Sequence, residues 1–121
     1  MRNRHRRGCG CHQERHNRWI EPSILYLLWQ EKKHGYELMT QIPELGFIHG
    51  SPDPGAIYRT LRHLEESGLV LSEWDTTGPG PAKRIYSLTE LGRDHLQLWS
   101  ESLRQRRNAL DAFLQKLDNL L

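Results

Sequence analysis

The amino-acid sequence predicts a mainly α-helical fold with one small β-hairpin and a long C-terminal helix. Apolar residues recur at helical spacing both before residue 68 and after residue 89. Between them, two short runs at 69–74 and 82–88 flank Asp75 to Pro81, where glycine and proline alternate and exclude a regular element. A chain of 121 residues favours one domain with a small core.

Residues 1–18 have no apolar period, and we predict that they form a flexible basic arm that is rich in cysteine and histidine. Residues 1–19 hold six arginines against one glutamate, although the net charge of the whole chain is only +2. A cationic arm on a nearly neutral body fits a nucleic-acid-binding protein, but a basic tail alone is common and unspecific.

Two helices are predicted to follow the arm. Glu21-Pro22 opens the first, because the missing N–H of proline costs nothing in a first turn. Ile24 to Trp29 is apolar on nearly every side and should be buried on more than one face. The turn His34-Gly35 should then lead into a second helix, from Tyr36 to about Glu44. Its expected apolar face holds Tyr36, Met39 and Ile42.

A third helix is predicted over residues 54–67. Ile57, Leu61 and Leu64 form its inward face, and Gly68 ends it because glycine readily adopts the left-handed conformation. The opposite face carries basic residues, and acidic residues appear only late. The strands 69–74 and 82–88 come directly after this helix and should pair as a hairpin.

The last helix is predicted to run from Thr89 to the end, about 30 residues or roughly 45 Å. Its apolar residues alternate three and four apart, which is a heptad pattern interrupted by one charge. We call these positions the seam residues: Leu96, Trp99, Leu103, Arg106, Leu110, Phe113, Leu117 and Leu120. A small core cannot cover so long a stripe, so we expect the helix to pack on its copy in a homodimer. The alternative is a helix folded back along its own domain.

This order of elements is a winged helix-turn-helix at residues 19–88, followed by a dimerisation helix at residues 89–121. The third helix would enter a major groove about 12 Å wide. A two-fold dimer would present two such helices to half-sites about 34 Å apart. The expected partner is therefore double-stranded operator DNA.

Three motifs in order and spacing resemble the PadR family of bacterial transcriptional regulators over residues 19–120. They are His34-Gly35-Tyr36-Glu37-Leu38, the stretch from Asp53 to Val70, and the stretch from Arg84 to Gly92. The single C-terminal helix resembles the shorter of the family's two subfamilies. The resemblance implies a dimeric repressor that a small molecule or stress signal releases from its operator. Many members of that family carry an additional arginine in the wing where this chain has Pro81, so one phosphate contact could be lost here. The N-terminal arginines could replace it.

The predicted DNA-binding residues lie on the third helix, the wing and the start of the second helix. Arg59 and Arg62 could grip guanine or hold phosphate. Tyr58 could donate to a phosphate or pack under the wing. Strand alternation points two wing cations to opposite faces, so only one of them should touch the backbone. The full set is Tyr36 (half core, half phosphate contact), Ser51, Tyr58, Arg59, Arg62, His63, Lys83 and Arg84.

Two features could switch DNA binding. The first is a possible metal site in the arm, because thiolate and imidazole suit zinc, copper(I) or an iron–sulfur cluster. Its ligands would be Cys9, Cys11, His12 and His16, although their spacing matches no standard zinc finger. The thiols could instead sense an oxidant, or the arm could be an accidental cluster. The second is Trp99, whose indole could stack on a planar ligand or simply pack in the core.

The sequence holds no glycine-rich phosphate loop after a strand, no HExxH and no nucleophile elbow, which argues against an enzyme. Its longest apolar run, Ile24 to Trp29, is far shorter than the about 20 residues of a membrane span. We expect a cytoplasmic DNA-binding repressor. The alternative is a metal-handling or adaptor protein whose winged helix binds protein.

Overall fold

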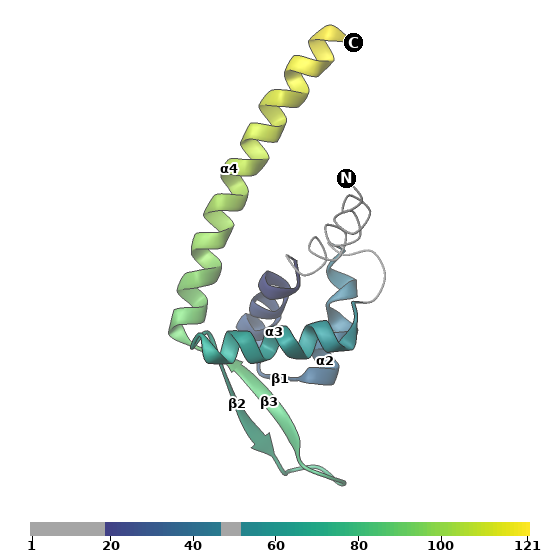
Figure 1. Cartoon of the computed structure of the whole chain (residues 1–121), viewed down its shortest axis with the longest axis vertical. Helices are drawn as coiled ribbons and strands as arrows, with labels where there is room; N and C mark the ends of the chain where they lie inside the picture. The colour runs from purple at the N-terminus through teal and green to yellow at the C-terminus, as the bar shows by residue number, and fades with distance from the viewer. Residues whose placement is uncertain (1–18, 47–51) are drawn as a thin grey trace, which may run out of the picture.

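The computed structural model describes residues 19–46 and 52–121. Residues 19–30 are helical and lead into β1 (Lys33–His34), α2 (Gly35–Gln41) and the short 3-10 helix η1 (Pro43–Leu45). Then come α3 (Pro54–Glu66), β2 (Val70–Asp75), β3 (Lys83–Leu88) and α4 (Glu90–Leu120). Figure 1 shows the β2–β3 hairpin on one side of α3 and α4 extending away on the other. The predicted mainly helical fold with a small antiparallel sheet is confirmed.

The sheet has three antiparallel strands in the order β1-β3-β2. The hairpin was predicted, and with residues 76–82 it forms what we call the wing. The expectation that His34-Gly35 is a turn was wrong. Lys33 pairs with Tyr86 and His34 with Ile85. A strand of two residues has no alternation to detect, and it exists only because β3 lies beside it.

The core lies between the N-terminal helix, α2, α3 and the hairpin. The inward face predicted for α3 is confirmed, since Ile57, Leu61 and Leu64 are almost fully buried. The N-terminal helix buries residues on more than one face, as predicted. Its contribution to the core consists of Ile20, Ile24, Leu25, Leu27 and Leu28.

Two boundaries differ from the prediction. The first helix does not open at Glu21-Pro22, because residues 19 and 20 are already helical. The second helix ends at Gln41, because Pro43 has no N–H with which to continue it, and η1 follows. Leu38 and Ile42 bury its inner face, whereas Tyr36 is 69% exposed and does not belong to that face.

α4 begins with a close joint to the rest of the body. The Thr89 side chain accepts a hydrogen bond from the Gly92 backbone N–H at 3.0 Å, so Thr89 is the N-cap that its residue type favours. It also donates to the Gly68 carbonyl at 2.7 Å. Gly92 is buried, and a Cβ there would meet the Leu69 carbonyl oxygen and lie 2.5 Å from Leu88 Cδ1. Glycine therefore allows α4 to lie against the start of the wing.

Only the first turns of α4 pack on the body. The Arg93 guanidinium lies 4.8 Å from the Trp29 ring centroid, and His95 Nε2 lies 3.1 Å from Glu21 Oε1. Farther along, Leu110 and Phe113 are each 58% exposed. Figure 1 shows this outer half standing apart from the body. The alternative of a helix folded back along its own domain is therefore wrong.

Within residues 19–46 and 52–121, no helix combines the length and the apolar character needed to cross a membrane.

Candidate nucleic-acid interface

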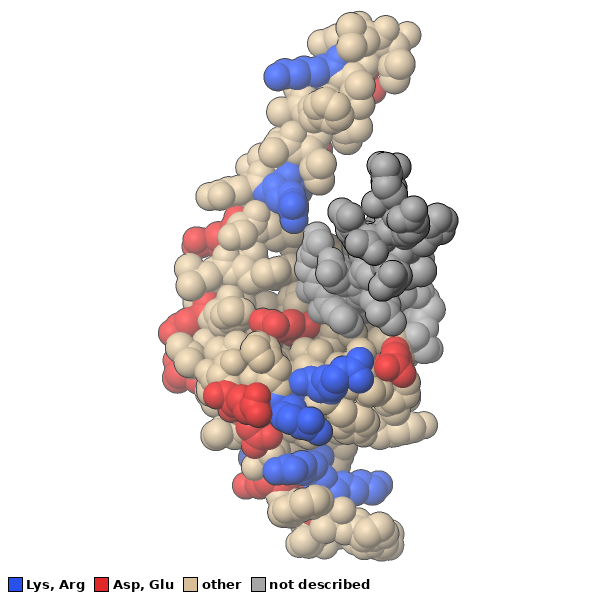
Figure 2. All heavy atoms as spheres, in the orientation of Figure 1, with Lys and Arg blue, Asp and Glu red and all other residues tan. Residues whose placement is uncertain are grey.

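The buried face of α3 determines which of its side chains point outward. Because Ile57, Leu61 and Leu64 pack inward, Tyr58, Arg59, Arg62 and His63 are all exposed. Figure 2 shows lysine and arginine side chains over α3 and along the wing on one face of the molecule. Acidic side chains lie among them in the same view, so this face offers individual cations for phosphate contacts and not a uniformly positive surface.

Three elements meet at a hollow of about 240 Å³ between α3 and the wing. It brings together four of the predicted residues, from α2, α3 and β3, with three that were not predicted. The lining residues are His34, Gly35, Tyr36, Tyr58, Lys83, Arg84 and Tyr86. The predicted DNA-binding residues of the wing and of α2 thus converge beside the N-terminal half of α3.

Gly35 allows the Tyr58 ring to approach the start of α2. A Cβ at Gly35 would lie 2.8 Å from Tyr58 Cε1 and 2.9 Å from its hydroxyl oxygen. Tyr58 is nevertheless 44% exposed. Both readings of Tyr58 therefore remain compatible with the structure, because one part of the ring is packed and another part is accessible.

The two wing cations differ in their surroundings. Arg84 Nε donates to Ser72 Oγ at 3.0 Å, and its guanidinium lies 5.2 Å from the Trp74 ring centroid. Ser72 Oγ in turn donates to Glu65 Oε2 at 2.7 Å, which connects β2 to α3. Lys83 is exposed and forms no ion pair among the described residues. Lys83 is therefore the freer of the two for phosphate.

The cations of α3 also divide into two groups. Arg59 and His63 line a second hollow together with Glu21, and Arg59 Nη2 lies 3.9 Å from Asp53 Oδ2. Nearby carboxylates thus oppose an anionic partner there. Arg62 has no ion pair in the described part of the chain. Ser51 lies outside the described residues.

His34 is a polar residue of this site whose role the sequence reading missed. Its ring nitrogens contact Glu37 at 3.0 Å and Asp75 at 2.8 Å. Hydrogen bonds to Asp75 and Glu37 raise the pKa of His34 above its ordinary value. Hydrogen bonds from Thr77, and then from His34, lower the pKa of Asp75 to about 2. The sequence did hold one signal for the contact with Glu37, because the two residues are three apart at the start of a helix.

Comparison with known proteins identifies the fold and the family. The sequence profile of the "Transcriptional regulator PadR-like family" matches residues 24–98. The chain belongs to this family. PadR-type regulators are non-enzymatic DNA-binding proteins, which confirms the expectation that this chain is not an enzyme.

Individual relatives agree with the family assignment. The transcriptional regulator YqjI of Escherichia coli (strain K12) is 31% identical over 114 residues, which covers 78% of this chain and 53% of YqjI. The chain thus spans about half the length of that curated relative. TM0937, described as a potential transcriptional factor, is 36% identical with a TM-score of 0.75, covering 85% of this chain and 90% of that one. Bacillus subtilis PadR, solved in complex with operator DNA, is 28% identical with a TM-score of 0.59, covering 66% and 45%.

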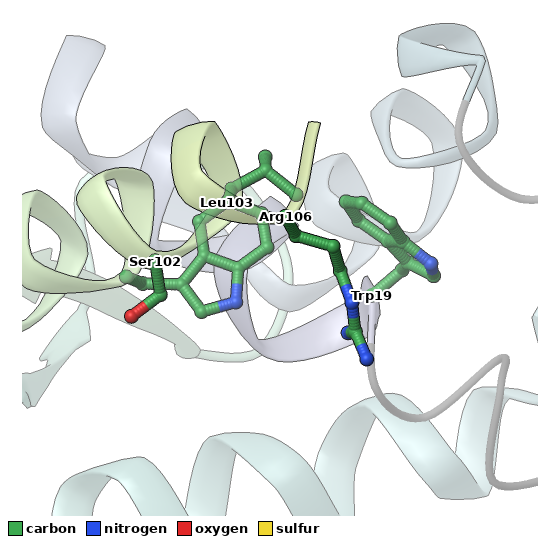
Figure 3. A pocket seen from close by; sticks show the side chains of 5 residues that line it. Trp19, Ser102, Leu103 and Arg106 are labelled. Carbon is green, nitrogen blue, oxygen red and sulfur yellow. The ribbon is translucent and has the colours of Figure 1, made fainter. Parts of the chain in front are cut away.

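The second predicted site of this PadR-family chain is at Trp99. Its indole packs edge-to-face on Trp19, with ring centroids 5.5 Å apart and an interplanar angle of 87°. The two rings line one hollow of about 250 Å³, with Ser102, Leu103 and Arg106, and a second of about 430 Å³ toward Leu45 and Leu96. Figure 3 shows the first hollow, with Trp19 and Arg106 beside it. Trp19 was not predicted as part of this site.

The predicted metal ligands Cys9, Cys11, His12 and His16 lie outside the described residues. Among the residues that are described, no group of three or more His, Cys, Asp and Glu side chains could hold a metal ion. The metal site in the arm stays a prediction.

Proposed function

We propose that the chain is a homodimeric, sequence-specific DNA-binding repressor that a chemical signal releases from its operator. The observation that supports DNA binding most directly is the convergence of Tyr36, Tyr58 and Lys83 at one hollow beside α3. Tyrosine hydroxyls and a lysine that forms no ion pair within residues 19–46 and 52–121 suit a phosphate, and phosphate contacts set the register of a recognition helix. The operator complex of Bacillus subtilis PadR adds a relative with a known DNA partner.

In this arrangement Arg62 reads base edges. It is exposed on α3 and forms no ion pair within the described residues. A guanidinium can hold guanine O6 and N7 with two hydrogen bonds. Arg59 and His63, closer to Glu21 and Asp53, contribute less.

The outer half of α4 supports the homodimer. Its seam residues Leu110, Phe113 and Leu120 are all more than half exposed, and the described part of the body leaves this apolar surface uncovered. A second copy of the same stripe can cover it by coiled-coil packing. The two α3 helices would then face successive major grooves on one side of the operator.

The hollows at Trp19 and Trp99 support a signal-binding site. Both hollows lie between the N-terminal helix and α4, the proposed dimerisation helix. The rings of Trp19 and Trp99 line each of them. A planar aromatic molecule bound in these hollows, beside the two rings, would change how α4 packs on the body, and so the spacing of the two α3 helices. Quenching of tryptophan fluorescence by such molecules, lost in Trp99→Phe, tests this part of the proposal.

The central experiment measures the affinity of the full chain for labelled DNA from upstream of its own gene at several salt concentrations. We expect tight binding relative to unrelated DNA, and a logarithmic affinity that falls linearly with the logarithm of salt, because phosphate contacts release counterions. Absent or salt-independent binding would contradict the proposal and favour the adaptor alternative.

A further inference from the structure

His34 lies between two carboxylates that come from different elements. Its Nδ1 is 3.0 Å from Glu37 Oε1 in α2, and its Nε2 is 2.8 Å from Asp75 Oδ2 at the end of β2. The Glu37 oxygen also accepts the His34 backbone N–H at 2.8 Å. One imidazole ring therefore connects the start of α2 to the end of β2 that leads into the wing loop.

The two contacts favour the protonated form of the ring. A neutral imidazole has one N–H, so it can donate to only one of two carboxylates, and its other nitrogen would face an anion. An imidazolium donates from both nitrogens and satisfies both contacts. The contacts with Asp75 and Glu37 raise the pKa of His34, whereas Thr77 contributes most to the lowered pKa of Asp75 and the His34 backbone N–H contributes most to the lowered pKa of Glu37.

Asp75 connects this contact to the DNA-facing part of the wing. While its Oδ2 meets His34, its Oδ1 accepts hydrogen bonds from the Thr77 backbone N–H at 3.0 Å and the Thr77 hydroxyl at 2.6 Å. Asp75 is also the strand partner of Lys83. A fixed Asp75 therefore holds the first residues of the wing loop and the strand position opposite Lys83.

Cations and hydroxyls also face the ring from the hollow between α3 and the wing. Lys83 and Arg84 of β3 line it, together with the phenols of Tyr36 and Tyr58. The two cations oppose a charge on His34, but Arg84 is held by Ser72 and Trp74, and the two carboxylates are in direct contact with the ring. The balance favours the imidazolium.

We propose that His34 is a positioning residue for DNA binding, whose protonated ring ties Asp75, where β2 meets the wing loop, to Glu37 in α2 and makes operator affinity pH-dependent. This inference rests on the proposed DNA-binding function. Loss of the proton releases one of the two contacts and loosens the wing, so that Lys83 no longer has one position relative to α3.

The direction of the pH effect follows from the pKa shifts. The pKa of His34 is raised, so its contribution is complete below the ordinary value of 6.5 and is lost as pH rises through the raised value. The pKa values of Glu37 and Asp75 are lowered, so their contributions are present above 4.5 and 3.8 and are lost at lower pH. The wing is held best between these limits.

The first test uses the full chain without DNA. NMR titration of the His34 ring gives its pKa, and the backbone amides of Thr77 and Lys83 report the wing. We expect these amides to shift with the midpoint of His34, and to lose that transition in His34→Gln. Backbone amides in the outer half of α4, such as that of Phe113, should show no such transition in either protein. Wing amides that ignore the His34 titration would overturn the proposal.

The second test measures operator affinity from pH 6 to 8.5 at constant ionic strength. We expect the wild-type affinity to fall by about tenfold, the order expected for the loss of one charge-assisted hydrogen bond. His34→Gln and Asp75→Asn should both bind more weakly at pH 6 and lose this pH dependence. The control His95→Gln removes an exposed histidine of α4 that is outside the predicted DNA-binding residues, and it should keep this pH dependence.

The two tests separate the possible failures. A pH dependence that persists in His34→Gln, or that is missing in the wild type, would overturn the role of His34 while DNA binding stands. If no DNA binds at any pH, the proposed function fails, and the NMR titration alone then decides whether His34 holds the wing.

Discussion

The body of the molecule and the outer half of α4 have similar sequence patterns but opposite surroundings. In the body, the apolar face of α3 is covered by the N-terminal helix, α2 and the hairpin, and its residues are nearly fully buried. In α4 the stripe is covered only as far as its first turns, and Leu120 near the end is 84% exposed. Helical spacing therefore predicts an apolar face, but not whether the same chain covers it.

The largest effect should come from charging the uncovered stripe. We expect Leu110→Glu combined with Phe113→Glu to convert the proposed dimer to a monomer at micromolar concentration, because carboxylates at paired seam positions would be buried without partners. Sedimentation velocity measures this. Leu98→Glu, at an exposed apolar residue off the seam, should leave the dimer intact. If both proteins sediment alike, α4 does not dimerise through these residues.

The next largest effect concerns the exposed face of α3. Arg62→Ala should abolish specific operator binding while the protein stays folded, because a bidentate contact to guanine contributes about 1–3 kcal/mol of discrimination. Footprinting and circular dichroism check the two halves of this expectation. Arg107→Ala, an exposed arginine of α4, is the matched control. An unchanged footprint in Arg62→Ala would remove Arg62 from the interface.

The contact between the start of α4 and the body should be sensitive to a single added methyl group. Gly92→Ala should lower the free energy of unfolding by about 1–3 kcal/mol, because the added Cβ would collide with the Leu69 carbonyl and with Leu88. Urea denaturation measures the loss. Gly78→Ala is the control, since a Cβ there meets nothing within 4 Å. Equal stabilities would mean that α4 can shift on the body at little cost.

The smallest effect belongs to the wing. Lys83→Ala should weaken binding to all DNA sequences about equally and reduce the salt slope by about 1, as expected for one phosphate contact. The affinity for operator and unrelated DNA at several salt concentrations tests this. A loss confined to the operator would instead assign Lys83 to base reading.

The sequence predicted the structure correctly wherever an element has a clear local pattern of its own. The spacing of Ile57, Leu61 and Leu64 predicted both α3 and its buried face, and Thr89 correctly marked the start of α4. It was a poor guide where a neighbour decides the outcome. The two residues of β1 have no period, and their strand depends on pairing with β3.

The candidate site shows the same limit. Residue type and place in a predicted element were enough to predict Arg62 and Lys83 as DNA-binding residues. The sequence did not distinguish Lys83 from Arg84, the other cation of the wing. The contact of Arg84 with Ser72 and Trp74 distinguishes them, and it requires the hairpin to be paired in register. His34 was missed as a site residue because Asp75, one of its two partners, lies 41 residues away.

By itself, the sequence determined the helices, the hairpin, the order of the elements and the basic face of α3, because these follow from local spacing and from turn residues. Only the tertiary structure decided that Trp19 meets Trp99, that His34 reaches the loop end of β2, and that the described body leaves the outer half of α4 uncovered. The physical reason is that such contacts join residues far apart along the chain. Their energy appears only after the elements have packed.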